Sequence, residues 1–354
     1  MPRRTALLVG INYRGTADEL NGCYNDVVNV ATYLRTVLGY APAAITMLTD
    51  GNRGSTFPAS VAPTRQNILA GLSALVAGIA SGDEAVFHYS GHGTLVRDTN
   101  GDEITGLDSC LCPLDYNTPA SAGGGIITDD DIRTLLVNRV PRGARLYVIL
   151  DCCHNGTGCD IRYKYEDYSL LLRPPSARTA PLWRTQQKAF ANGKYTETAG
   201  EVYMISGCRD EQSSADAYIN NAFAGALTYA VFAILRANQA SIRTYSWSAL
   251  LRDVRYFMRV NKYDQIPQIM TGQLITPAAA VFPRLAAAAA AKRGVGSGSL
   301  ELGFGFGSGS VPGGSRGVAA EGPNTTLFGF KPKPNPNPKP KSGDNTRYAI
   351  QFLH

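Results

Sequence analysis

A histidine and a cysteine stand in short motifs that each follow an apolar stretch. His92 lies in HYSGHG, residues 88–93, and Cys153 lies in DCCHNG, residues 151–156. A thiol with an ordinary pKa near ~8.5 is mostly protonated at neutral pH, so a nucleophilic cysteine needs a nearby base. The two motifs therefore predict a cysteine nucleophile paired with a histidine base.

The sequence offers alternatives for both members of this pair. Glycines flank His92, which suits a sharp loop with room for a substrate backbone. His88 falls inside an apolar pattern and is better explained as a packed or hydrogen-bonded residue. His154 directly follows the cysteines, but neighbouring side chains at a strand end point in opposite directions. The same alternation favours one of Cys152 and Cys153 without saying which.

Strand-like and helix-like stretches alternate along the chain and would position both motifs. The apolar stretches cover 6–9, 45–48, 85–89, 146–150 and 202–206; the longer amphipathic ones cover 25–38, 64–79, 129–137, 224–235 and 246–260. This alternation predicts an α/β fold, with a mostly parallel sheet flanked by helices on both faces. Ligands bind beyond the carboxyl ends of the strands in such sheets, and both motifs follow strand ends.

The composition divides the chain into four parts. We expect a large catalytic region at 1–165, an exposed connection rich in proline and basic residues at 166–199, a small region at 200–284, and a Gly/Pro/Lys-rich tail at 285–354. Thirteen of the 37 glycines and seven of the 20 prolines follow Leu285, so the tail adds little packed core. Residues 347–352 could still add an edge strand.

Charge and cysteine usage limit the location and the partners. Of the formal charge of +6, five units lie after Leu285, so a solvated linker explains the basic tail better than an anionic partner does. The tail has no interleaved aromatic platform for nucleic acid, and no apolar run is long enough to cross a membrane. Seven cysteines, an odd and sparse set, favour reduced thiols, and we expect a cytoplasmic protein.

Together with LLVGINY at 7–13 and LNGCYND at 20–26, the two motifs resemble those of the metacaspases, calcium-dependent peptidases related to caspases. The resemblance spans residues 5–283 and implies a caspase-like sheet, with p20-like and p10-like regions in a type I-like core that has no N-terminal prodomain. It implies Cys153 as nucleophile, His92 as base, and the backbone amides of Gly93 and Cys153 as oxyanion donors. It also implies a monomer.

Two aspartates next to these motifs suggest the substrate preference. If Asp26 and Asp151 converge, their charges favour Arg or Lys and repel Asp. The resemblance adds Ser90 and Cys23 to this specificity pocket. Asp26 could instead complement a helix dipole, and Asp151 could cap a turn.

Calcium is the cofactor that the resemblance implies, at a site made by Asp108, Asp129, Asp130 and Asp160. Hard carboxylate oxygens suit this ion. Asp129 or Asp130 could instead merely begin a helix after Thr128. The stretch 98–103 lacks the full spacing of a calcium loop, and we expect a solvated loop there. The cysteine spacings fit structural zinc sites poorly.

The leading hypothesis is a calcium-dependent cysteine endopeptidase that cleaves protein substrates after Arg or Lys through an acyl-enzyme. Basic residues in and near the connection suggest self-cleavage; the candidates are Arg162, Lys164, Arg173, Arg178, Arg184, Lys188 and Lys194. The alternative is a catalytically silent scaffold acting through its proline-rich tail. A caspase-type enzyme cutting after Asp needs a basic pocket, and neither motif supplies an Arg. Cys152, where the family usually has Ser, is either a small buried residue or a redox partner of Cys153.

Overall fold

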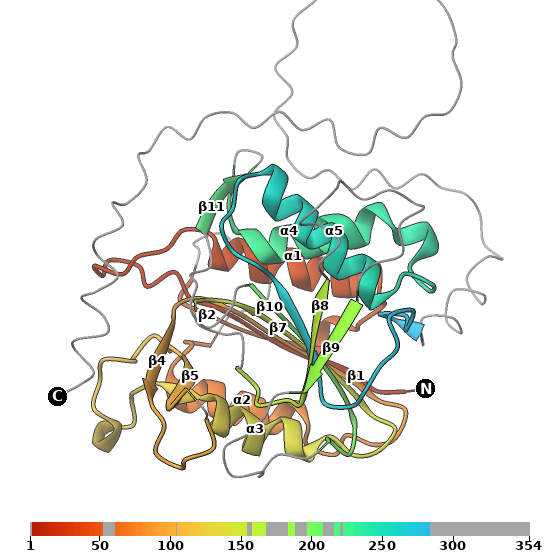
Figure 1. Cartoon of the computed structure of the whole chain (residues 1–354). Coiled ribbons are helices and arrows are strands. Elements are labelled where there is room, and N and C mark those ends of the chain that lie inside the picture. Colours follow the sequence, from red (N-terminus) through yellow and green to blue (C-terminus); the bar gives the residue numbers. More distant parts are fainter. Residues whose placement is uncertain are drawn as a thin grey trace, which may run out of the picture. The chain divides into compact units, whose positions relative to one another are not determined.

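The central feature of the fold is an eight-stranded sheet of order β2-β1-β3-β7-β10-β13-β8-β9 (Figure 1). The computed structural model describes residues 2–51, 61–103, 105–153, 158–167, 183–187, 197–207, 216–219 and 222–283. The strands are β1 Arg4–Gly10, β2 Ile45–Thr49, β3 Glu84–Ser90, β7 Arg145–Asp151, β10 Glu201–Ser206, β13 Gln268–Thr271, β8 Tyr163–Asp167 and β9 Trp183–Gln187. The first five in spatial order run parallel and the last three pair antiparallel, so the predicted mostly parallel α/β sheet is confirmed.

Two neighbouring interior strands, β3 and β7, carry the two motifs at their carboxyl ends. Every residue of β3 is buried, and so are all residues of β7 after Arg145. Parallel strands that are covered on both faces need such continuous apolar sequence. Their register pairs Ser90 with Asp151, so the chain leaves the sheet at the same level on both strands.

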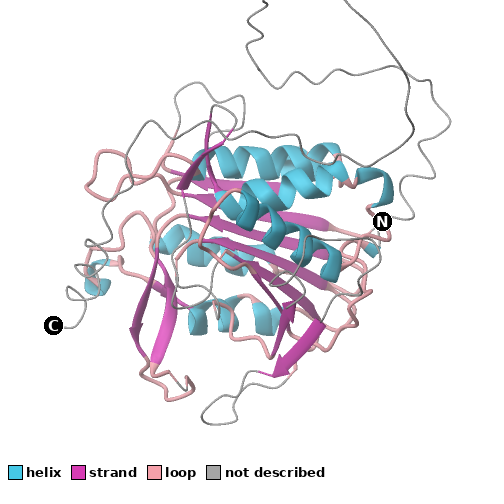
Figure 2. Cartoon of the chain, turned by 45° about the horizontal axis from the view of Figure 1, so that its top comes forward, coloured by secondary structure: helices cyan, strands magenta, loops and turns pink. Residues whose placement is uncertain are grey.

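Helices cover both faces of the sheet. One face carries α1 Cys23–Thr36, α4 Ala226–Ala237 and α5 Trp247–Val260, and the other carries α2 Arg65–Leu75 and α3 Asp129–Leu135 (Figure 1). Figure 2 shows the same layers of helices and strands from another angle. The side chains of Thr64, Thr128 and Ser246 begin α2, α3 and α5 by accepting a bond from the amide three residues on. Short 3-10 helices cover Pro42–Ala44, Ala120–Ala122, Val137–Arg139 and Gln239–Ser241.

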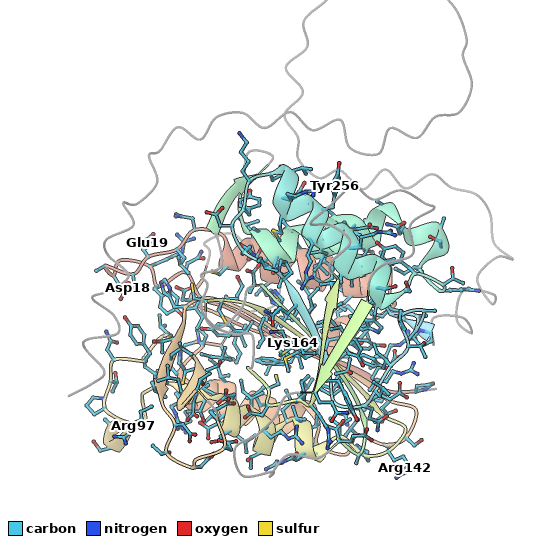
Figure 3. The ribbon with its side chains drawn as sticks, in the orientation of Figure 1. Asp18, Glu19, Arg97, Arg142, Lys164 and Tyr256 are labelled. Atoms are coloured by element: carbon cyan, nitrogen blue, oxygen red, sulfur yellow. The ribbon has the colours of Figure 1, made fainter. Side chains whose placement is uncertain are left out.

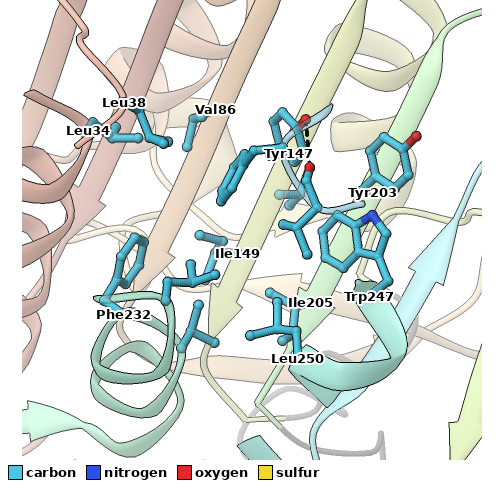
Figure 4. Close-up of a pocket in the computed structure, with 15 residues that line it drawn as sticks. Leu34, Leu38, Val86, Tyr147, Ile149, Tyr203, Ile205, Phe232, Trp247 and Leu250 are labelled. Carbon is cyan, nitrogen blue, oxygen red and sulfur yellow. Dashed lines mark hydrogen bonds between the residues drawn. The ribbon is translucent and has the colours of Figure 1, made fainter. Parts of the chain in front are cut away.

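The core under α1, α4 and α5 encloses a small apolar cavity (Figure 4). Its volume is about 30 Å³, and aliphatic and aromatic side chains such as Phe232, Ile149 and Trp247 line it. Tyr147 closes one side and donates its hydroxyl to the carbonyl of Val281 at 3.0 Å. A cavity without polar partners does not hold an ordered water, so this space is a packing defect rather than a site.

Two small sheets lie outside the central one. A three-stranded antiparallel sheet contains β4 Gly93–Arg97, β5 Leu107–Leu111 and β6 Ile127–Thr128, and a hairpin contains β11 Asp216–Ile219 and β12 Ala222–Gly225. In Figure 1, β4 and β5 project from the end of the sheet where the parallel strands terminate. β4 begins at the residue after His92, so this small sheet extends directly from the first motif.

The structure differs from the expected division of the chain in one respect. The connection expected at 166–199 contributes the end of β8 and all of β9 to the central sheet, where Tyr163 and Tyr165 of β8 are buried in strand alternation. The large and small regions share this sheet through the parallel pairing of β7 with β10. The tail at 285–354 and the edge strand suggested at 347–352 lie outside the described residues. Among the described residues, no helix has the length and apolarity needed to cross a membrane.

Candidate active site

The loops after β3 and β7 are in direct contact. A Cβ atom built on Gly93 would lie 2.2 Å from the carbonyl oxygen of Cys153 and 3.2 Å from the sulfur of Cys152. Real Cβ atoms do not approach a backbone oxygen so closely, so only glycine fits at position 93. This contact places the residue after His92 against the backbone of Cys153.

His92 is held by a loop from the amino-terminal part of the chain. Its Nε2 lies 2.7 Å from the carbonyl oxygen of Asp18, and the ring of Tyr13 packs against it with the centroids 4.6 Å apart. A carbonyl oxygen only accepts hydrogen bonds, so Nε2 carries the proton and the neutral ring keeps its lone pair on Nδ1. Tyr116 donates its hydroxyl to the carboxylate of Asp18 and so fixes the residue that orients the imidazole. Figure 3 labels Asp18 at the end of the sheet from which β4 projects.

Cys153 differs in exposure from the other cysteines of the described part of the chain. It is half-buried, whereas Cys23, Cys110, Cys112, Cys152 and Cys159 are buried. Burial raises the pKa of the Cys112 thiol to about 12, which keeps it protonated at neutral pH. Cys152 packs in the core on the face of α2 and α3. Solvent therefore reaches Cys153 and not its neighbour. His154 and Cys208 lie outside the described residues.

The hydrogen-bond ladder between β4 and β5 determines the direction of the Gly93 amide, one of the two expected oxyanion donors. Cys112 donates its amide to the carbonyl of His92, which makes these residues a hydrogen-bonded pair. Gly93 follows in the non-bonded position opposite Leu111. In an antiparallel ladder, a residue at such a position points its amide away from the partner strand. The Gly93 amide thus points out from the free edge of β4.

Asp26 and Asp151 lie close together, which is the condition for a pocket that prefers a basic side chain. A Cβ atom on Gly225 would lie 2.2 Å from Asp151 Oδ2 and 2.8 Å from Asp26 Oδ2. Both carboxylates are buried. Asp26 comes from the first turn of α1 and Asp151 from the end of β7, so two distant parts of the sequence present acids to one point.

Backbone amides at the start of α4 bind these carboxylates. Asp26 accepts the amide of Gly225 at 2.9 Å and the hydroxyl of Ser90 at 2.7 Å, and Asp151 accepts the amide of Thr228 at 2.8 Å. Gly225 has no side chain to cap the helix, so aspartates from other elements satisfy its first amides. Asp26 lies in the first turn of α1, as its helix-dipole alternative expected, while the carboxylates of both aspartates bind amides at the start of α4.

Two further buried residues are Cys23, the remaining member of the predicted pocket, and His88, which the sequence predicted to be a core residue. Cys23 is buried one turn before Asp26 in α1 and donates its amide to Asn12 Oδ1 at 3.0 Å. His88 is buried, with its Nε2 3.1 Å from the hydroxyl oxygen of Thr228. Burial lowers the pKa of His88 to about 3, so this imidazole is neutral at physiological pH. His88 is therefore the hydrogen-bonded core residue that its place in the strand predicted.

A second group of acids surrounds the start of α3. Asp108, Asp129 and Asp160 are buried and Asp130 is half-buried. Burial, followed by the charges of Asp98 and Asp130, raises the pKa of Asp108 to about 6. Thr128 and Asp131 form the capping box at the start of α3. The carboxylates of Asp129 and Asp130 are not part of this box and contribute to groups that could hold a metal.

The structure corrects the interpretation of residues 98–103. Asp102 and Glu103 are buried, and their carboxylates lie within 4.8 Å of other acids in the group. The prediction of a solvated loop is therefore wrong for these two residues, although Thr99, Asn100 and Gly101 are exposed. The side chain of Asp98 accepts the amides of Asn100, Gly101 and Glu103, and this turns the last acids of the loop inward.

Sequence reasoning missed the residues that act through their backbone. The carbonyl of Asp18 and the amides of Gly225 and Thr228 are backbone groups, so the residue types at these positions do not indicate their role.

Of the self-cleavage candidates, Arg162 directly precedes β8, Lys164 lies in β8 and Arg184 lies in β9. Arg173, Arg178, Lys188 and Lys194 lie outside the described residues.

Comparisons with known proteins identify the family of the chain. The family profile "Metacaspase, peptidase C14 domain" matches residues 4–162. Metacaspase-1 of Yarrowia lipolytica is 34% identical over 295 residues, which cover 75% of this chain and 61% of that protein. Metacaspase-1 of Scheffersomyces stipitis is 33% identical over 296 residues, which cover 75% of this chain and 70% of that protein. The crystal structure of protein GSU0716 from Geobacter sulfurreducens shares the fold, with a TM-score of 0.50, 24% identity, and coverage of 78% of this chain and 96% of that one. By the match to its profile and by its identity to these relatives, the chain belongs to the metacaspase family.

Proposed function

We propose that the protein is a cysteine endopeptidase with Cys153 as nucleophile and His92 as general base. The contact of Gly93 with the Cys153 backbone carries this proposal, because it sets the histidine loop against the only cysteine of the described residues that is not buried. The bond from His92 Nε2 to the Asp18 carbonyl supports it, since this bond leaves Nδ1 available to take a proton.

The reaction follows from these groups. His92 takes the thiol proton, the Cys153 sulfur bonds to the substrate carbonyl carbon, and the amides of Gly93 and Cys153 donate to the oxyanion. His92 then gives its proton to the leaving nitrogen as the carbon–nitrogen bond breaks, which leaves a thioester. Water loses a proton to His92 and adds to the thioester carbon, the carbon–sulfur bond breaks to release the acid, and the Cys153 sulfur takes the proton from His92.

The convergent carboxylates support cleavage after Arg or Lys. Among the donors to Asp26 and Asp151 are backbone amides and a hydroxyl, which are neutral groups, and we propose that both carboxylates are ionised. A guanidinium or ammonium group complements two such charges, whereas an aspartate side chain is repelled. Ser90 and Cys23 complete the proposed pocket, and peptides or proteins with a basic residue at the cut are the expected substrates.

The acids around α3 fit a calcium ion. Asp108, Asp129, Asp130 and Asp160 supply hard oxygen donors, and Asp108 and Asp129 are connected, because the amide of Ser109 donates to Asp129 Oδ2 at 2.9 Å. Bound calcium would offset part of this negative charge. β5 joins this region to the dyad: Asp108 lies near its start, and Cys112, just after its end, donates to the carbonyl of His92. A cation that fixes the positions of these acids would thereby also help to hold the loop that contains His92, the proposed base.

Self-cleavage is expected outside the paired strands. β8 pairs with β13 on one side and β9 on the other, so Lys164 lies in a backbone bonded at both edges. A protease binds an extended, unpaired backbone, and cutting at Lys164 would first require β8 to leave the sheet. Peptide mapping after calcium addition should therefore find new termini at other basic residues and not after Lys164.

One assay tests the proposal. Wild-type protein and the variant Cys153→Ala are incubated with matched peptides that carry Arg, Lys or Asp at the cut, with calcium or with a chelator. We expect the wild type to cleave the Arg and Lys peptides only with calcium, and the variant to cleave none. Turnover by the variant, or preference for the Asp peptide, would overturn the assignment of the nucleophile or of the pocket.

A further inference from the structure

We propose that the acidic site binds two divalent, oxygen-preferring cations, and that the loop 98–103 supplies ligands to both. The inference rests on the proposed calcium dependence and extends it. The acids form three groups whose carboxylate oxygens lie within 4.8 Å of one another. The first contains Asp98, Asp102 and Asp108; the second Asp102, Asp130 and Asp160; the third Glu103, Asp129 and Asp160.

The first and third groups share no residue. Each therefore offers its own set of three carboxylates, and one cation in each would use no ligand of the other. The second group connects them, because it takes Asp102 from one and Asp160 from the other. Carboxylates that lie between two cations commonly serve both, since each has two oxygens.

Asp102 gives the independent sign of a ligand. Its side chain is 1% exposed, and neither carboxylate oxygen has a hydrogen-bond partner among the described residues. Burying an unpaired carboxylate costs several kcal/mol, so such groups are protonated, paired or bound to a metal. Asp102 belongs to the first and second groups, so its carboxylate suits the cation of the first group.

The charge of the site also exceeds what one ion balances. Seven carboxylates take part in the three groups. One divalent cation leaves a net charge of five negative, and a second reduces it to three. The guanidinium of Arg133 donates to the carbonyl of Asp160 at 2.7 Å, and that of Arg65 binds the carboxylate of Asp131, which belongs to none of the three groups, at 3.3 Å. Asn100 ties the loop to α3 by donating its amide to Asp130, so the acids of the loop are held at the site.

Calcium titration by calorimetry on the full chain carrying Cys153→Ala, which avoids self-cleavage, tests the inference. We expect two ions per chain at saturation, one ion for Asp102→Asn in the same background, and two for the control Asp253→Asn, whose carboxylate lies on α5. Stoichiometry near one for the starting protein would overturn the second site and leave calcium dependence standing.

Other outcomes are equally distinct. No binding at all would overturn the calcium part of the proposed function. Two ions per chain with Asp102→Asn would overturn the role of this residue. If that variant does not fold, as judged by circular dichroism, the stoichiometry of the starting protein still decides between one site and two.

Discussion

The imidazole of His92 is bonded through Nε2 to the backbone carbonyl of Asp18, 2.7 Å away. No charged side chain performs this task in the described contacts of the ring. The orientation of the base therefore depends on the position of the loop that contains Asp18, and Tyr116 fixes that loop through the Asp18 carboxylate.

Tyr116→Phe should therefore lower kcat about three- to tenfold, because a hydrogen bond to a charged group is worth about 1.5 to 3 kcal/mol, part of which the loop absorbs. KM for an Arg peptide should stay unchanged, and the acidic limb of the kcat/KM profile should move. Tyr256→Phe on α5, across the sheet in Figure 3, is the control. Equal kcat and pH profiles for all three proteins would contradict a positioning role.

Gly93→Ala should reduce kcat/KM at least about 100-fold, because the new methyl group would overlap the Cys153 carbonyl and displace the nucleophile. The neighbouring Thr94→Ala, on the same strand, serves as control. Single-turnover kinetics measures the acylation rate directly. Near-normal acylation in Gly93→Ala would show that the two loops separate without loss of chemistry.

Asp151→Asn should raise KM for an Arg peptide about 10- to 100-fold, since a charged hydrogen bond is worth about 1.5 to 3 kcal/mol. Asparagine keeps one oxygen for the Thr228 amide, so the start of α4 should persist. Asp83→Asn, whose side chain binds the amide of Arg3 at the opposite end of the sheet, is the matched control. An unchanged ratio of Arg to Asp cleavage would remove Asp151 from the pocket.

His88 should make the fold less stable in acid. Its pKa is about 3 when folded and near ~6.5 when unfolded, so between these values the unfolded chain binds the extra proton. The free energy of unfolding should fall by up to about 1.4 kcal/mol per pH unit below pH 6.5. Urea unfolding of Cys153→Ala protein with and without His88→Asn measures this. Equal slopes against pH in both proteins would show that His88 is not the source.

Cys152→Ser should leave both activity and inactivation by peroxide unchanged. The Cys152 thiol is buried in the core, where oxidant does not reach it, while Cys153 is half-buried. The residual activity after a series of peroxide doses, followed by reduction with dithiothreitol, reports any difference. Protection by Cys152→Ser would instead identify a bond between the adjacent sulfurs.

The sequence predicted the elements that alternate in long apolar and amphipathic stretches. The β3 and β7 strands, the five helices and the place of both motifs follow from such periodicity. It did not predict β4 and β5, where buried acids such as Asp108 interrupt the apolar pattern. The charged residues of β8 prevented its prediction as a strand, although the buried residues Tyr163 and Tyr165 follow the two-residue period of a strand.

The sequence indicated those parts of the candidate site whose chemistry follows from the residue type. It did not indicate the parts that depend on how the backbone is folded. Two aspartates near the motifs suggested a basic substrate, and both converge on Gly225. The burial of Asp102 and Glu103 depends on a turn made by Asp98, and a polar loop of this composition usually stays exposed. Backbone groups that orient His92 have no sequence signature at all.

The shared point of Asp26, Asp151 and Gly225 also has a consequence for biosynthesis. His92 and Cys153 emerge from the ribosome well before α4, and the pairing of β3 with β7 needs no later residue. The two acids, however, obtain their amide donors only when Gly225 and Thr228 have been made. A nascent chain that ends before α4 therefore has the strands of the proposed dyad but lacks the amide donors of both acids, so we expect the proposed pocket to form only when nearly the whole sheet has been synthesised.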